Sequence, residues 1–136
     1  MYSVKTLPNG LRVVTAPSGG AASVTITVFA GAGSRYETQR ERGISHFLEH
    51  MFFKGGNKYR NTKEVSAAID GVGGDFNAFT GKEYAGYYVK VASEHLELAA
   101  DVLSDMLLNA SFPQEEIEKE RGRIMEEERR YQDTPM

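Results

Sequence analysis

The sequence contains no cysteine and no tryptophan, only 4 prolines, and no long run of apolar residues. Without cysteine the chain can form no disulfide bond and offers no thiolate ligand to a metal. Any first-row metal would therefore have to be held by imidazole nitrogens and carboxylate oxygens. No apolar run approaches the roughly 20 residues that a membrane-spanning helix needs, so we expect no membrane partner.

The charge balance and the N-terminus also give little indication of a partner or an organelle. The net charge is −3, which gives no reason to expect nucleic acid as a partner. The first residues, Met1 to Lys5, are already strand-like, with no signal or transit peptide ahead of them. We therefore expect a cytoplasmic protein, unless a targeting segment has been trimmed away.

What the chain does contain is the composition of an ordinary globular protein, with 136 residues of which 40% are hydrophobic and 26% charged. We expect one domain over residues 1–136. Turn, cap and periodicity signals predict strands over residues 4–7, 11–15, 23–30, 75–79 and 83–91. They predict helices over residues 41–53 and 63–70, a third helix that Ser93 caps and that runs to about residue 109, and a last helix that Ser111 caps and that runs to about residue 132. This β-β-β-α-α-β-β-α-α order predicts an α+β fold, a mainly antiparallel sheet with helices packed on one face.

The most informative segment lies on the first predicted helix, where two histidines and a glutamate are spaced as His46-x-x-Glu49-His50. On a helix of 3.6 residues per turn, these three positions lie within an arc of roughly 100° and project from one face. Two imidazoles and a carboxylate on one face can bind a metal and handle protons. The spacing is also the reverse of the His-Glu-x-x-His zinc protease motif, the inverzincin signature.

Two glutamates on the last helix occupy unexpected positions. Counted in heptads from Ile117 and Ile124, Glu120 and Glu127 share the stripe that should face the core. A carboxylate there costs several kcal/mol unless a cation or a metal compensates it. Alternatively, this charged helix is exposed nearly all round and both glutamates are solvated. A catalytic zinc typically takes three protein ligands, so either glutamate can complete a site with the two histidines.

The combination resembles the pitrilysin, insulysin and mitochondrial-processing-peptidase family of zinc endopeptidases. Besides the histidine motif and the two glutamates, three further segments match that family, so the resemblance covers the whole chain. These segments are Leu7-Pro8-Asn9-Gly10-Leu11, residues 73–80 with the sequence Gly-Gly-Asp-Phe-Asn-Ala-Phe-Thr, and Glu118-Lys119-Glu120-Arg121 leading to Glu126-Glu127-Glu128.

The resemblance implies a role for each residue of the motif. His46, His50 and Glu127 would bind one Zn²⁺, with water in the fourth position. Glu49 would act as the general base on that water. Glu120 would orient a histidine or assist proton transfer. The fold would be that of the family's first domain.

The resemblance also implies a peptide substrate that binds as an added strand, with Asn77 and Ala78 contacting its backbone. Family members are longer and carry domains that close over the first, so we expect self-association or a complementary domain to supply the missing half. The leading hypothesis is a zinc endopeptidase core. The alternatives are a non-catalytic zinc-binding or partner subunit and a two-histidine-one-carboxylate iron site, against which the adjacent Glu49 argues.

Overall fold

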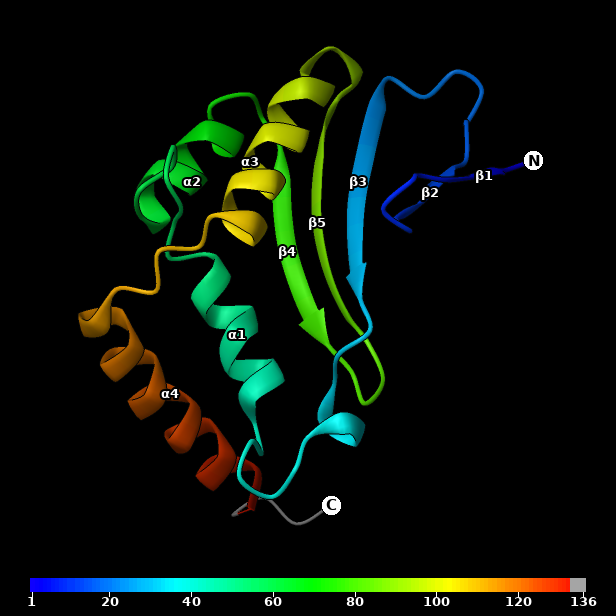
Figure 1. The fold of residues 1–136 in the computed structure, drawn as a ribbon. Helices are drawn as coiled ribbons and strands as arrows, with labels where there is room; N and C mark the ends of the chain where they lie inside the picture. Colours follow the sequence, from blue (N-terminus) through cyan, green and yellow to red (C-terminus); the bar gives the residue numbers. More distant parts are fainter. Residues whose placement is uncertain (133–136) are drawn as a thin grey trace.

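A computed structural model describes residues 1–132 of the chain, so the last four residues of the predicted domain lie outside the described residues (Figure 1). In chain order the elements are β1 (Ser3–Thr6), β2 (Arg12–Thr15), β3 (Ser23–Ala30), the 3₁₀ turn η1 (Ser34–Tyr36), α1 (Ile44–Phe52), α2 (Thr62–Asp70), β4 (Asp75–Thr80), β5 (Ala85–Ala92), the 3₁₀ turn η2 (Ser93–His95), α3 (Leu96–Leu108) and α4 (Gln114–Gln132). None of the described helices combines the length and apolarity needed to cross a bilayer. The predicted α+β class and element order are confirmed.

The strands form two antiparallel sheets where the sequence predicted one. Strands β1 and β2 pair as a hairpin from Ser3 opposite Thr15 to Thr6 opposite Arg12. The other three strands form a separate sheet in the order β3-β5-β4, with β5 in the middle, and Figure 1 shows the hairpin set apart beyond β3. The turn at Pro8-Asn9-Gly10 specifies the pairing inside the hairpin but not the strand on which the hairpin packs.

Helices α2 and α3 cover one face of the three-stranded sheet (Figure 1). Side chains alternate along the strands, so every second residue of β5, from Ala85 to Val91, is buried in this core, where the ring of Tyr87 packs against Phe52 of α1. Burying one such aliphatic side chain stabilises the fold by about 1.5–3 kcal/mol. The fully buried core residues include Val65 and Ile69 of α2, Val89 of β5, and Val102 and Met106 of α3.

Helix α1 is fixed at its start by a side chain outside the helix. The carboxylate of Glu37 accepts hydrogen bonds from the backbone N–H groups of Gly43 at 2.7 Å and Ser45 at 2.9 Å. Gly43 adopts the left-handed conformation with φ 85°, which glycine reaches without strain. The predicted start at Glu41 was therefore wrong, because the chain turns at Gly43 and the helix begins only at Ile44.

The segment after α1 is fixed by a buried carboxylate of α3. Asp105 accepts hydrogen bonds from the backbone N–H groups of Asn57 at 3.1 Å and of Lys58 and Tyr59 at 2.9 Å each. Gly56 allows this approach, because a Cβ there would lie 2.5 Å from the backbone oxygen of Asp105. Both ends of α1 are thus anchored, which fixes the position of the histidine motif.

Helix α4 begins at Gln114, after a segment in which Ser111 does not act as the predicted cap. The Ser111 hydroxyl donates instead to the backbone oxygen of Gly55 at 3.2 Å. Phe112 has a positive φ of 43°, so the chain turns sharply before the helix can start. The helix then packs along α1 (Figure 1).

Candidate metal centre

Helices α1 and α4 bring together three side chains that could hold a metal ion. The Nε2 atoms of His46 and His50 lie 3.1 Å apart, as expected for residues one helical turn from each other. From α4, Glu127 places Oε2 at 3.8 Å from Nε2 of His46. One donor atom from each of these three residues lies within 4.8 Å of the others.

These distances fit a single zinc ion. Zinc binds imidazole nitrogen at about 2.0–2.1 Å, so two nitrogens at the tetrahedral angle lie roughly 3.3–3.4 Å apart. The two Nε2 atoms are close to that separation, and the carboxylate oxygen of Glu127 lies somewhat farther out, at 3.8 Å from Nε2 of His46. Two imidazoles and one carboxylate also form a donor set typical of catalytic zinc, in which a fourth position stays open.

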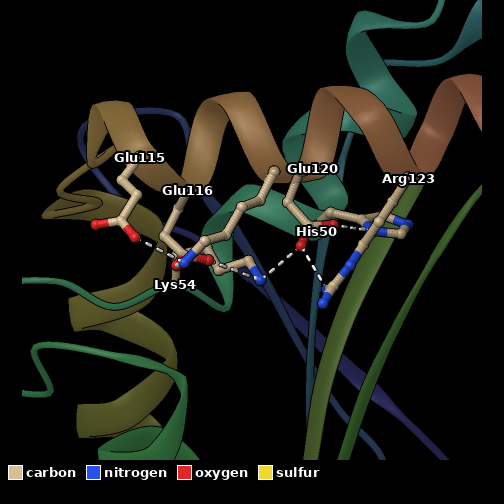
Figure 2. A network of polar contacts seen from close by, with 7 residues as sticks. His50, Lys54, Glu115, Glu116, Glu120 and Arg123 are labelled. Carbon is tan, nitrogen blue, oxygen red and sulfur yellow. Dashed lines mark hydrogen bonds and ion pairs between the residues drawn. The ribbon is translucent and has the colours of Figure 1, made fainter.

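Glu120 lies directly behind His50, and its side chain is only 1% exposed. Its Oε2 lies 2.9 Å from Nδ1 of His50, while its Oε1 lies 2.7 Å from Nζ of Lys54 and 2.8 Å from Nη1 of Arg123 (Figure 2). Because α4 runs antiparallel to α1, Glu120 meets the end of α1 and Glu127 its beginning.

These partners keep Glu120 charged although it is buried. Burial alone would raise the pKa of Glu120, but hydrogen bonds from Lys54 and His50 and the charges of Lys54 and Arg123 outweigh it and hold the pKa below its usual value. An ionised carboxylate only accepts hydrogen bonds, so the proton between the two residues belongs to Nδ1 of His50. In a neutral imidazole that carries its proton on Nδ1, Nε2 has the lone pair, and Nε2 of His50 lies toward His46.

Glu49 does not belong to the group of three donors. Its carboxylate accepts a hydrogen bond from the hydroxyl of Thr80, the last residue of β4. The carboxylate of Glu49 also affects Tyr87 on the neighbouring strand. Burial and the negative charge of Glu49 together raise the pKa of Tyr87 to about 12. The structure thus ties Glu49 to the end of the sheet.

Asn77 and Ala78 lie in β4, which is an edge strand of the three-stranded sheet within the described residues. They pair with Tyr88 and Tyr87 of β5 on one side. The side-chain oxygen of Asn77 accepts a hydrogen bond from the backbone N–H of Ala78 at 2.8 Å. A peptide that used this N–H would first have to displace the Asn77 side chain. The role of both residues in binding a substrate stays a prediction.

Sequence reasoning missed the residues that hold the motif in place, namely Lys54 and Arg123 at Glu120, and Thr80 at Glu49. The two cations had a usable signal in their spacing, because Lys54 follows His50 by four positions and Arg123 follows Glu120 by three. Arg123 lies on the same helix as Glu120, and Lys54 lies in the turn that directly follows α1. Thr80 had none, because its partner is 31 residues away in the chain.

Comparison with known proteins agrees with this geometry. Residues 12–136 match the family model described as insulinase, peptidase family M16. The chain belongs to this family. The resemblance inferred from the histidine motif and the two glutamates is thereby confirmed.

Relatives in the insulinase family are longer than this chain. A zinc protease of Bacillus subtilis (strain 168), YmxG, is 46% identical over 130 residues, which are 96% of this chain and 32% of that protein. A mitochondrial-processing peptidase subunit beta of Caenorhabditis elegans is 46% identical over 124 residues, 91% of this chain and 27% of that protein. The crystal structure of a protease from Helicobacter pylori superimposes with a TM-score of 0.90 at 28% identity, covering 99% of this chain and 32% of its own. The chain therefore spans about a third of the length of such relatives.

Proposed function

We propose that this chain is the zinc-binding catalytic core of an endopeptidase that hydrolyses extended peptides or small unfolded polypeptides. The observation that carries the proposal is the arrangement of two imidazoles and two carboxylates, three of which lie together while the fourth lies apart. His46, His50 and Glu127 converge on one point, whereas Glu49, on the same helical face, is held apart by Thr80. A set of three ligands with a separate base is what metal-assisted hydrolysis requires.

Each residue then has a defined task. His46 and His50 present Nε2, and Glu127 presents a carboxylate oxygen. Zinc held by these three atoms would supply a Lewis acid that makes water a nucleophile near neutral pH and polarises the peptide carbonyl. Glu49 takes a proton during attack and returns it to the leaving amine. The hydroxyl of Thr80 keeps one oxygen of Glu49 in place, so the other stays available for proton transfer.

Strand β4 supports a peptide as the substrate. Its edge is unpaired in the described part of the chain, and it ends at Thr80, beside the proposed base. A peptide that adds to this edge past Asn77 and Ala78 would be guided toward Glu49. Recognition through backbone hydrogen bonds requires an extended substrate and is tolerant of side-chain sequence.

The rest of the surface that encloses a bound peptide would come from outside residues 1–136. The chain covers about a third of its relatives, one of which is a beta subunit. We therefore propose that a complementary domain or a second copy encloses the substrate. The same relative supports the alternative of a zinc-binding subunit without activity of its own. Against it, a subunit without activity would have no need to hold Glu49 at Thr80 and clear of the metal ligands.

Zinc content and peptide cleavage, measured on the same preparations, test the proposal. Glu49→Gln should keep the zinc and lose cleavage by at least about 10²-fold, since general acid–base catalysis supplies about 10²–10⁴. Glu127→Gln should lose zinc. Glu126→Gln, whose exposed side chain pairs with Arg130, should behave as the parent protein. A parent without zinc would contradict the proposal, and zinc without cleavage would favour the non-catalytic subunit.

A further inference from the structure

The carboxylate of Glu120 has two oxygens with different partners. Oε2 faces the imidazole of His50, at 2.9 Å from Nδ1. Oε1 faces two cations, Nζ of Lys54 at 2.7 Å and Nη1 of Arg123 at 2.8 Å (Figure 2). Whatever fixes Oε1 therefore also fixes the direction in which Oε2 points. The orientation of the Glu120 carboxylate is therefore set by Lys54 and Arg123, the two cations that bind the oxygen facing away from His50.

The two cations differ in burial, and this decides which of them controls Glu120. The side chain of Lys54 is 12% exposed, whereas that of Arg123 is 66% exposed. An ion pair in contact with solvent contributes little, because water screens it and the long side chain loses entropy on forming it. Breaking a buried pair is far more disruptive, because a charge is left without compensation. Lys54 is therefore the cation on which Glu120 depends.

Lys54 is also held more firmly than Arg123. Its backbone N–H donates to the oxygen of Met51 at 3.0 Å, so its main chain continues directly from the end of α1. Its Nζ lies 3.2 Å from Oε2 of Glu116, one turn before Glu120 on α4 (Figure 2). Lys54 thus connects the helix that carries both histidines with two successive turns of the facing helix. Arg123 lies on the same helix as Glu120 and cannot make that connection.

We propose that Lys54 is a positioning residue of the metal centre, which clamps Glu120 so that its second oxygen binds Nδ1 of His50 and leaves Nε2 free for the metal. The inference deepens the proposed function and rests on it, in that His50 must be a zinc ligand. Lys54 itself touches neither metal nor substrate. It acts only through Glu120.

Loss of the Lys54 ammonium should weaken zinc binding without removing a ligand. The carboxylate would turn toward Arg123 and solvent, and Nδ1 of His50 would lose the acceptor that orients its ring. Partners of this kind typically change metal affinity by about 10–100-fold when they are removed. Arg123 is expected to matter less, by about threefold at most, because water replaces it at an exposed site.

The test is zinc affinity, measured by competition with a chromophoric chelator on the protein at its natural length. Lys54→Met should bind zinc roughly 10-fold more weakly or worse. Lys54→Arg, which restores a cation, should recover most of the loss. Lys119→Met is the matched control: this lysine pairs with Glu115 and Glu116, is 51% exposed and forms no ion pair with Glu120 within the described part of the chain, so its loss should leave the affinity unchanged.

A double substitution keeps the test valid if Lys54→Met alone does not fold. Lys54→Met with Glu120→Gln removes both charges, so no unpaired charge stays buried. The double variant should match Glu120→Gln alone in zinc affinity within about twofold, since additivity fails when two residues act through one contact. A double variant much weaker than Glu120→Gln would show that Lys54 acts by another route and overturn the inference.

The inference and the proposed function can fail separately. A parent protein that binds no zinc would contradict the proposed function itself. A parent that binds zinc normally, with Lys54→Met unaffected or with Arg123→Met equally impaired, would contradict only the role of Lys54.

Discussion

Replacement of Asp105 by asparagine should destabilise the protein far more than the small change in shape suggests. Asp105 lies on α3, is 5% exposed, and binds three consecutive backbone N–H groups of the segment that follows α1. Oδ2 accepts from Lys58 and Tyr59, and Oδ1 accepts from Asn57. Asparagine fits the same space but offers only one oxygen, so its NH₂ group must face an N–H donor.

The expected loss follows from those three bonds. A hydrogen bond to a charged group contributes about 1.5–3 kcal/mol and a neutral one about 0.5–1.5 kcal/mol. If the amide oxygen takes the place of Oδ2, the bond to Asn57 is lost and the bonds to Lys58 and Tyr59 become neutral. Because such contributions are not fully additive, we expect a decrease of roughly 3 kcal/mol in the free energy of unfolding.

Asp101→Asn is the matched control, since Asp101 lies on the same helix one turn earlier. Its side chain is 40% exposed and accepts from Nζ of Lys58 and from the hydroxyl of Tyr59. Contacts at such an exposed site contribute about 1 kcal/mol or less. Urea unfolding followed by circular dichroism gives both values, provided that the slopes of the two transitions agree.

The effect should also depend on pH. Burial would raise the pKa of Asp105, but the backbone hydrogen bonds of Tyr59 and Lys58 outweigh it and lower the pKa. A lowered pKa means that the stabilisation is present above the unfolded value of about 3.9 and is lost as the pH falls through the folded value. The difference between parent and Asp105→Asn should therefore shrink below about pH 4. A loss no larger than that of Asp101→Asn, or one that is unchanged at pH 3, would refute this reasoning.

Two further predictions concern Glu49 and its neighbours. Thr80→Val should lower kcat by roughly 10-fold through misplacement of Glu49, with zinc content unchanged and Thr80→Ser restoring the rate in a peptide-cleavage assay; an unchanged kcat would argue that the hydroxyl has no role. Burial raises the pKa of both Tyr59 and Tyr87 to about 12, helped by a hydrogen bond to Asp101 and by the charge of Glu49, respectively. The stabilisation from these two tyrosines should be present below about pH 10 and be lost as the pH rises through 12. The ultraviolet spectrum of the parent minus that of Tyr59→Phe or Tyr87→Phe isolates the replaced tyrosine, and tyrosinate in that difference at about pH 10.5 would contradict the prediction.

The sequence predicted the fold class and the close approach of His46 and His50, because both follow from regular spacing. His46 and His50 are one turn apart, so any helix brings them together. The heptad count also placed Glu120 on the buried stripe, where the structure has it. Glu127 shares that stripe but is 45% exposed, because it faces the start of α1 and not the covered turn at Lys54.

Features that depend on tertiary context were not predictable in this way. The start of α1 at Ile44 depends on Glu37, a residue outside the helix whose carboxylate accepts from the backbone N–H groups of Gly43 and Ser45. The separation of the β1–β2 hairpin from the main sheet depends on packing that no local turn signal encodes. The sequence shows Asp105 only as one of several charged residues on a predicted helix. Its role as acceptor for the backbone N–H groups of residues 57–59 arises only in the folded chain. Each of these features needs a partner that is distant in the chain.

The most direct test of the metal centre is anomalous diffraction at the zinc edge from crystals of the protein. We predict one peak at about 2.0–2.1 Å from Nε2 of His46 and from Nε2 of His50, and at a similar distance from a carboxylate oxygen of Glu127. Nδ1 of His50 should stay bound to Glu120. A peak at Nδ1 of His50, a peak that excludes Glu127, or no peak in zinc-loaded crystals would contradict the account.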